Sequence, residues 1–252
     1  MAKIAVFAGH GGNNPGAVFG PLREKDYTLA VSNEVTAILR YQGYNVINNR
    51  TIDIDRSITA DANLANSQNV DAVVEIHLNS NEGIPYSGTE TFFSVFDTGR
   101  GRELATAINR NIVSLGFKDN GIKTRVNSEG TDYFGILRLT HAPAVLVETA
   151  FINNPQDMAM YDIGTMAEAI ANGIMEVFPI NQAQANIQPV AYGTVRTDGA
   201  NLNIREFPSV QARVLGVIPN GGSVSVYGSS GNWYIISYSG ISGYASADFI
   251  MM

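Results

Sequence analysis

Apolar residues over the first 178 positions of the chain follow two alternating patterns. Residues 4–7, 72–76 and 144–147 are short, mostly apolar runs, which are typical of strands buried in a sheet. Residues 44–47 and 89–96 contain aromatic and β-branched side chains, and this composition favours further strands.

Segments with the spacing of amphipathic helices lie between these runs. Apolar residues recur every three or four positions from Tyr27 to Leu39, and Gly43 is well placed to end this first helix. Further helices are expected at about 57–67, with Ser57 as the N-cap, at 100–115 and at 166–177. Strands that alternate with helices predict an α/β domain with a twisted, largely parallel sheet flanked by helices.

The pattern changes towards the C-terminus. Residues 179–192 carry no charged side chain and are rich in Gln, Asn, Ala and Pro, which is linker composition. After residue 193, short strand-like runs such as 223–227 and 234–238 are separated by glycine-rich turns, which predicts a small all-β barrel. We therefore predict a first domain at 1–178, a linker at 179–192 and a second domain at 193–252.

Charge and composition exclude several classes of protein. The formal net charge of -7 argues against nucleic acid and anionic lipid as partners. No apolar run approaches the roughly 20 residues that a membrane span needs, and the N-terminus is too short for a signal-peptide core. We expect a monomer without nucleic-acid or membrane partners. It is made in the cytoplasm and released by lysis or a phage holin, or the chain begins after a removed signal.

Three predicted strands end in residues that can bind a metal or move a proton, namely His10, His77 and Glu148. Ligands of open α/β sheets bind at the carboxyl ends of strands, where the loops converge. The chain has no cysteine, so a metal must be held by His, Asp or Glu. Zinc in hydrolytic sites commonly takes two histidines and a glutamate, and the third ligand should lie near the start of the first helix. Glu24 and Asp26 both satisfy that geometry.

Four segments carry a more specific resemblance. GHGGNNPGA at 9–17, EKD at 24–26, EIHLN at 75–79 and PAVLVE at 143–148 occur in order and at compatible spacing. Together they resemble the zinc-dependent N-acetylmuramoyl-L-alanine amidases over most of residues 3–178. Two positions depart from the family pattern: Asn14 stands where an Asp is usual, and Glu75 stands where a small residue commonly precedes the histidine by two positions.

The resemblance implies a set of roles. His10, Glu24 and His77 would bind one zinc ion per chain, and Glu148 would be catalytic. The substrate would be peptidoglycan, cut at the amide bond between N-acetylmuramic acid and L-alanine of the stem peptide at the bacterial cell wall. Residues 193–250 resemble bacterial SH3-like modules, which often bind cell wall.

The sequence argues against two other functions. A non-catalytic protein that binds cell wall or a partner on an amidase scaffold would not need all four site residues, yet the chain retains them. A zinc carboxypeptidase would need a fixed cation for the terminal carboxylate, and no arginine stands at the end of a predicted strand.

Overall fold

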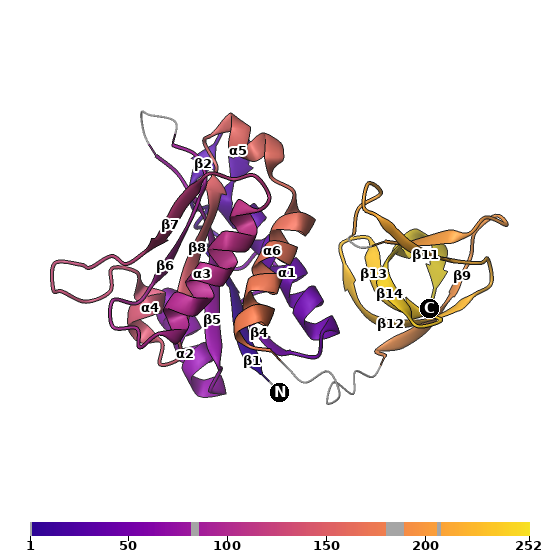
Figure 1. Ribbon diagram of the computed structural model, residues 1–252, viewed down its shortest axis with the longest axis horizontal. Coiled ribbons are helices and arrows are strands. Elements are labelled where there is room, and N and C mark those ends of the chain that lie inside the picture. Colours follow the sequence, from indigo (N-terminus) through magenta and orange to yellow (C-terminus); the bar gives the residue numbers. More distant parts are fainter. Residues whose placement is uncertain (1, 82–85, 180–188, 206–207) are drawn as a thin grey trace. The chain divides into compact units, whose positions relative to one another are not determined.

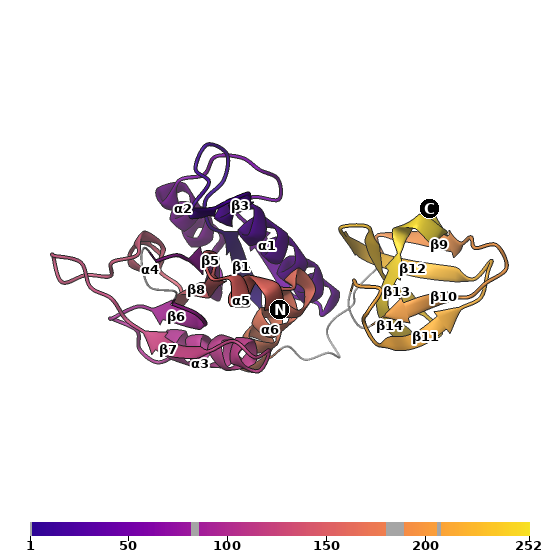
Figure 2. The same ribbon diagram turned by 90° about the horizontal axis from the view of Figure 1, so that it is seen from above.

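The computed structural model describes residues 2–81, 86–179, 189–205 and 208–252, which form two compact units (Figures 1 and 2). The strands of the first unit are β1 (Lys3–Ala8), β2 (Val18–Phe19), β3 (Leu22–Arg23), β4 (Asn45–Asn48), β5 (Ala72–Asn79), β6 (Thr89–Phe93), β7 (Asp119–Lys123) and β8 (Ala144–Phe151). Its helices are α1 (Glu24–Tyr41), α2 (Ile58–Gln68), α3 (Arg100–Val113), α4 (Gly135–Leu139), α5 (Pro155–Met160) and α6 (Ile163–Val177).

Side-chain caps fix where several of these helices begin. The Ser57 hydroxyl accepts a hydrogen bond from the Ala60 amide and caps α2, as the sequence predicts. Asn154 caps α5, whose first residue is Pro155, and Asp162 caps α6.

Six strands of the first unit form one sheet in the order β4-β1-β5-β8-β6-β7. Neighbours are parallel except β6 and β8, which are antiparallel, so the sheet is mixed and largely parallel. Only residues 80–88 join β5 to β6. A connection this short cannot hold the helical crossover that a parallel neighbour of β5 or β8 would need, so β6 runs the other way.

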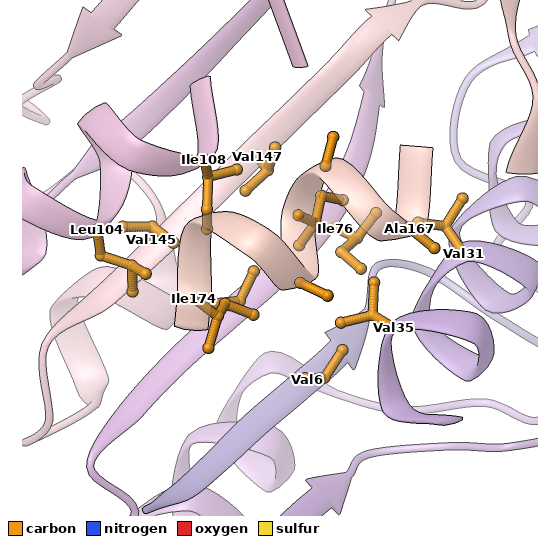
Figure 3. Packing of buried hydrophobic residues seen from close by; sticks show 14 of the residues in the cluster. Val6, Val31, Val35, Ile76, Leu104, Ile108, Val145, Val147, Ala167 and Ile174 are labelled. Carbon is orange, nitrogen blue, oxygen red and sulfur yellow. The ribbon is translucent and has the colours of Figure 1, made fainter. Parts of the chain in front are cut away.

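Helices cover the two faces of this sheet unequally. On one face, α1, α3 and α6 pack over alternate side chains of β1, β5 and β8 in the larger core. Figure 3 shows this packing, in which Val6, Ile76 and Val147 of the sheet lie among side chains of the three helices. On the other face, α2 and α4 cover a smaller core around Phe7, Val73 and Leu146. The second face carries the candidate site.

The second unit is an all-β body with its own core. Its strands are β9 (Ala191–Val195), β10 (Leu202–Arg205), β11 (Val214–Ile218), β12 (Ser223–Ser230), β13 (Trp233–Tyr238), β14 (Ile241–Ser246) and β15 (Ile250–Met251), with a short 3₁₀ helix at Ala247–Phe249. They form one antiparallel sheet in the order β11-β10-β14-β13-β12-β9-β15. Val195, Ile204 and Ile236 are among the side chains of its core.

The predicted combination of an α/β unit with a small all-β unit is therefore confirmed. The predicted linker at 179–192 lies largely outside the described residues, and its last two residues, Ala191 and Tyr192, already belong to β9. No helix in the described ranges is long and apolar enough to cross a membrane.

Candidate active site

A cavity of about 360 Å³ lies on the α2 and α4 face of the sheet. Its walls come from β5, β8, the starts of α1, α2 and α4, and the loop that follows β1. His10, Glu24, His77 and Glu148, the four residues singled out from the sequence, all line it.

Three of these side chains converge on one point. Nε2 of His10 lies 3.1 Å from Oε2 of Glu24, and Nδ1 of His77 lies 2.9 Å from Oε1 of the same carboxylate. One ligand atom from each residue falls within 4.8 Å of the others. Two imidazoles and a carboxylate are a donor set that zinc prefers, so the residues fit a metal of this kind.

The Glu24 carboxylate is held from several sides. The Ala17 amide donates to its Oε2 at 2.8 Å and the Leu78 amide donates to its Oε1 at 2.9 Å. Burial opposes its ionisation, but the contacts with His10 and His77 outweigh burial and lower the pKa of Glu24. The carboxylate is therefore ionised and fixed in orientation.

A tight turn presents His10 to this carboxylate. His10 has a φ of 63°, which a residue other than glycine adopts only where the surroundings enforce it. Gly11 and Asn14 exchange two backbone hydrogen bonds, both 3.0 Å long. Asp53 and Asp55 accept hydrogen bonds from the amides of Gly12 and Asn13, which ties the turn to the loop before α2.

Arg50 connects the two segments that carry His10 and Glu24. Its buried guanidinium donates from Nη2 to the carbonyls of Gly9 (3.0 Å) and Lys25 (2.9 Å). Gly9 precedes His10 and Lys25 follows Glu24. One side chain thus fixes the distance between the end of β1 and the start of α1.

Glu148 lies on the neighbouring strand, in register with His77. Its Oε2 is buried and has no hydrogen-bond partner among the described residues. Burial is the main cause that raises the pKa of Glu148 to about 8. Glu148 lines the cavity, and because its Oε2 makes no hydrogen bond the carboxyl group can hold or release a proton there.

Strands β5 and β8 are longer than the sequence pattern predicts. His77 and Glu148 lie inside β5 and β8, which extend to Asn79 and Phe151. The hydrogen-bonded ladder continues there because the two strands pair with each other, with a register shift between His77 and Asn79. The polar side chains follow the alternation of the strand and do not end it.

The two acids at the start of the first helix, Glu24 and Asp26, point in different directions. Glu24 faces the histidines, whereas Asp26 pairs with Arg23 at 2.9 Å on the surface. His141, the third histidine of the chain, is exposed and is not part of the cluster.

Sequence reasoning missed two charged residues in the cavity wall. Arg56, directly before the capping Ser57, and Asp61 of α2 both line the cavity and form an ion pair of 2.7 Å. The sequence signal that could have revealed them is Asp61, an acidic residue on the inward face of the predicted second helix. A buried acid needs a partner, and Arg56 is the nearby cation.

Comparisons with known proteins identify the family and the fold. Residues 4–177 match the N-acetylmuramoyl-L-alanine amidase family, and residues 200–251 match the bacterial SH3 domain. The YqiI protein of Bacillus subtilis (strain 168) is 35% identical over 179 residues, which cover 68% of this chain and 82% of YqiI. The N-acetylmuramoyl-L-alanine amidase CwlM of Bacillus licheniformis is 31% identical over 207 residues, which cover 78% of this chain and 77% of CwlM.

A solved structure gives the same fold. Cwp6 from Clostridium difficile is similar with a TM-score of 0.67 and 33% identity, over 70% of this chain and 29% of Cwp6. An α/β unit with a polar cavity on one sheet face, joined to an SH3-like unit, is thus the class that fold and site define. The chain belongs to the N-acetylmuramoyl-L-alanine amidase family, and it is a peptidoglycan amidase.

The close approach of Gly9 to His77 generates a first prediction. A Cβ at Gly9 would overlap the imidazole ring of His77, 2.5 Å from its Nε2 and 2.7 Å from its Nδ1. Gly9→Ala should therefore turn the ring away. If the cluster of His10, Glu24 and His77 binds Zn²⁺, this binding should weaken by about 10–100-fold, the usual cost of disturbing the support of a ligand. The measurement is a zinc titration against a competing chelator, with circular dichroism to verify folding.

Gly228→Ala is the control for this variant. Its added methyl group would meet Ile235 at 3.7 Å, which is ordinary contact. Equal zinc affinity in Gly9→Ala and Gly228→Ala would contradict the proposed crowding of His77.

Proposed function

We propose that this chain cleaves the amide bond between N-acetylmuramic acid and L-alanine of the stem peptide by zinc-dependent hydrolysis. One observation carries the proposal. The cluster of His10, Glu24 and His77 and the unpartnered carboxylate oxygen of Glu148 line the same cavity. A hydrolase needs both a place for a Lewis acid and a group that accepts a proton from water.

His10, Glu24 and His77 would hold the ion. A zinc ion bound there supplies a Lewis acid for the scissile carbonyl and lowers the pKa of a water molecule to roughly 7. The Ala17 and Leu78 amides keep the Glu24 carboxylate in position, and Arg50 keeps the backbone beside His10 in place.

Glu148 would act as general base and then as general acid. Its free Oε2 takes the proton of the attacking water and returns it to the nitrogen of the leaving amine. The carboxyl group has no competing hydrogen bond at this oxygen in the described part of the chain. It can therefore exchange a proton without first breaking a contact of the fold.

The second unit would hold the enzyme on its substrate. Every residue of the candidate site lies in the first unit, so the SH3-like unit is proposed to bind cell wall and not to take part in the chemistry. Such tethering raises the effective concentration of insoluble substrate. The proposed place of action is the bacterial cell wall.

The metal assignment predicts the behaviour of His77→Ala. Loss of one imidazole leaves two protein ligands, so zinc content and amidase activity should fall together. Elemental analysis of the purified protein beside a turnover assay checks this. His141→Ala, which removes an exposed histidine outside the cluster, should retain both properties. Full zinc occupancy in His77→Ala would contradict the assignment.

Glu148→Gln should separate catalysis from metal binding. Because Glu148 is proposed to move protons and not to bind the metal, the variant should keep its zinc. Its activity should fall by about 10²–10⁴-fold, the usual worth of positioned acid–base catalysis. Glu129→Gln, at an exposed position, is the control. If Glu148→Gln turns over at the wild-type rate, Glu148 is not the base, and Glu75 is the next candidate.

Truncation after Phe178 should separate chemistry from tethering. The first unit has its own hydrophobic core, so the shortened chain should fold, bind zinc and cleave small soluble muropeptides at the full-length rate. Its binding to intact cell wall and its clearing of wall suspensions should both decrease. Wall pull-down and soluble turnover of the two chains check this. A folded truncation that loses soluble turnover would mean that the second unit completes the active site.

A further inference from the structure

Glu75 is a buried carboxylate beside the candidate metal ligands. It lies on β5 two residues before His77, so both side chains point to the same face of the sheet. Its exposed fraction is 6%, and its Oε2 lies 3.4 Å from Nε2 of His77. Its side chain makes no other hydrogen bond or ion pair within the described residues.

The carboxylate of Glu75 requires a partner at this buried position. Burial of an ionised carboxylate is costly unless the group is paired, and His77 is its partner here. Two carboxylates therefore flank one imidazole: Glu24 at Nδ1, 2.9 Å away, and Glu75 at Nε2 on the other side of the ring.

The two sides of the ring have different tasks. A neutral imidazole carries one proton, and the nitrogen that holds it cannot bind a metal. Nδ1 is the ring nitrogen that faces Glu24. A metal ion held beside Glu24 and His10 would therefore take the lone pair of Nδ1, and the proton would be on Nε2. Nε2 faces Glu75, whose carboxylate oxygen lies 3.4 Å away and could accept such a proton.

We propose that Glu75 is a positioning residue that fixes the tautomer and the ring orientation of His77 for metal binding. The inference rests on the proposed function, since it takes His77 as a zinc ligand. Carboxylates that receive the outer N–H of a ligating histidine raise its basicity as well as orienting it. Glu75 is not itself a ligand in this arrangement, because it lies across the ring from Glu24 and outside the cluster of three.

Two variants and one control test the role. Glu75→Ala removes the acceptor, whereas Glu75→Gln keeps a carbonyl oxygen that can still accept from Nε2. Asp61→Asn is the matched control: Asp61 is a buried acid that lines the same cavity, and its carboxylate pairs with Asn49 and Arg56, not with a histidine. Zn²⁺ affinity is measured against a competing chelator, and ¹⁵N NMR reads the tautomer of His77 in the zinc-loaded protein.

Glu75→Ala should bind zinc about 10–100-fold more weakly than the wild type. Glu75→Gln should recover part of this loss, and Asp61→Asn should stay within about twofold of the wild type. The NMR spectrum of the wild type should show a slowly exchanging proton on Nε2 of His77, and Glu75→Ala should lose that protection. A structural role alone would not move this signal.

Several results would overturn the assignment. They are wild-type affinity in Glu75→Ala, an equal loss in Asp61→Asn, or a zinc-loaded wild type in which His77 carries its proton on Nδ1. If Glu75→Ala does not fold, the zinc affinities of Glu75→Gln and Asp61→Asn are compared instead. An equal affinity in these two variants would overturn the assignment. A wild-type protein that takes up no zinc refutes the proposed function itself, whereas zinc uptake with no effect of Glu75 refutes only this inference.

Discussion

The buried carboxylate of Glu24 is the interaction on which the site depends. An ionised carboxylate is stable out of water only when donors surround it, and here two segments of the chain, the loop after β1 and strand β5, supply four of them. The Ala17 amide, the Leu78 amide, His10 and His77 all meet it within 3.1 Å. The loop after β1, the start of α1 and the end of β5 must therefore be in place together. The group that gathers the histidines is also the group that a metal would share with them.

The sheet sets which carboxylate stays free for chemistry. Glu148 and Glu90 are register partners on β8 and β6, so their side chains lie on the same face. Glu90 accepts hydrogen bonds from Asn79 and Lys123, which satisfy both of its oxygens. Glu148 receives no such partner at Oε2. The pairing of β6 with β8 thus puts a carboxylate with both oxygens bonded beside one with an unbonded oxygen, and the latter lines the cavity.

Much of this arrangement could be predicted from the sequence, and the limits have physical causes. Apolar runs located β1, β5 and β8, and the polar residues that follow them include His10, His77 and Glu148. Position alone could not choose between Glu24 and Asp26, because both stand at the helix start, and only the family resemblance favoured Glu24. Successive residues of a helix are rotated by about 100°, so only one of two acids spaced by two positions can face the strands. The direction of β6 was also missed, although the short connection after β5 excludes a crossover.

The contact between Glu75 and His77 could not be predicted from the alternation of residues along the strand. Strand alternation places residues 75 and 77 on one face of the sheet, which is all that spacing can state. Whether a carboxylate there touches its neighbour, and at which ring nitrogen, depends on the rotamer of His77. That rotamer is set by the neighbours of the ring: Gly9, which leaves room only because it has no side chain, and Glu24, which attracts Nδ1. Once Nδ1 faces the helix, Nε2 faces back along β5, where Glu75 is the acid within reach. The support of the ligand is thus a consequence of tertiary packing, even though the ligand itself is visible in the sequence.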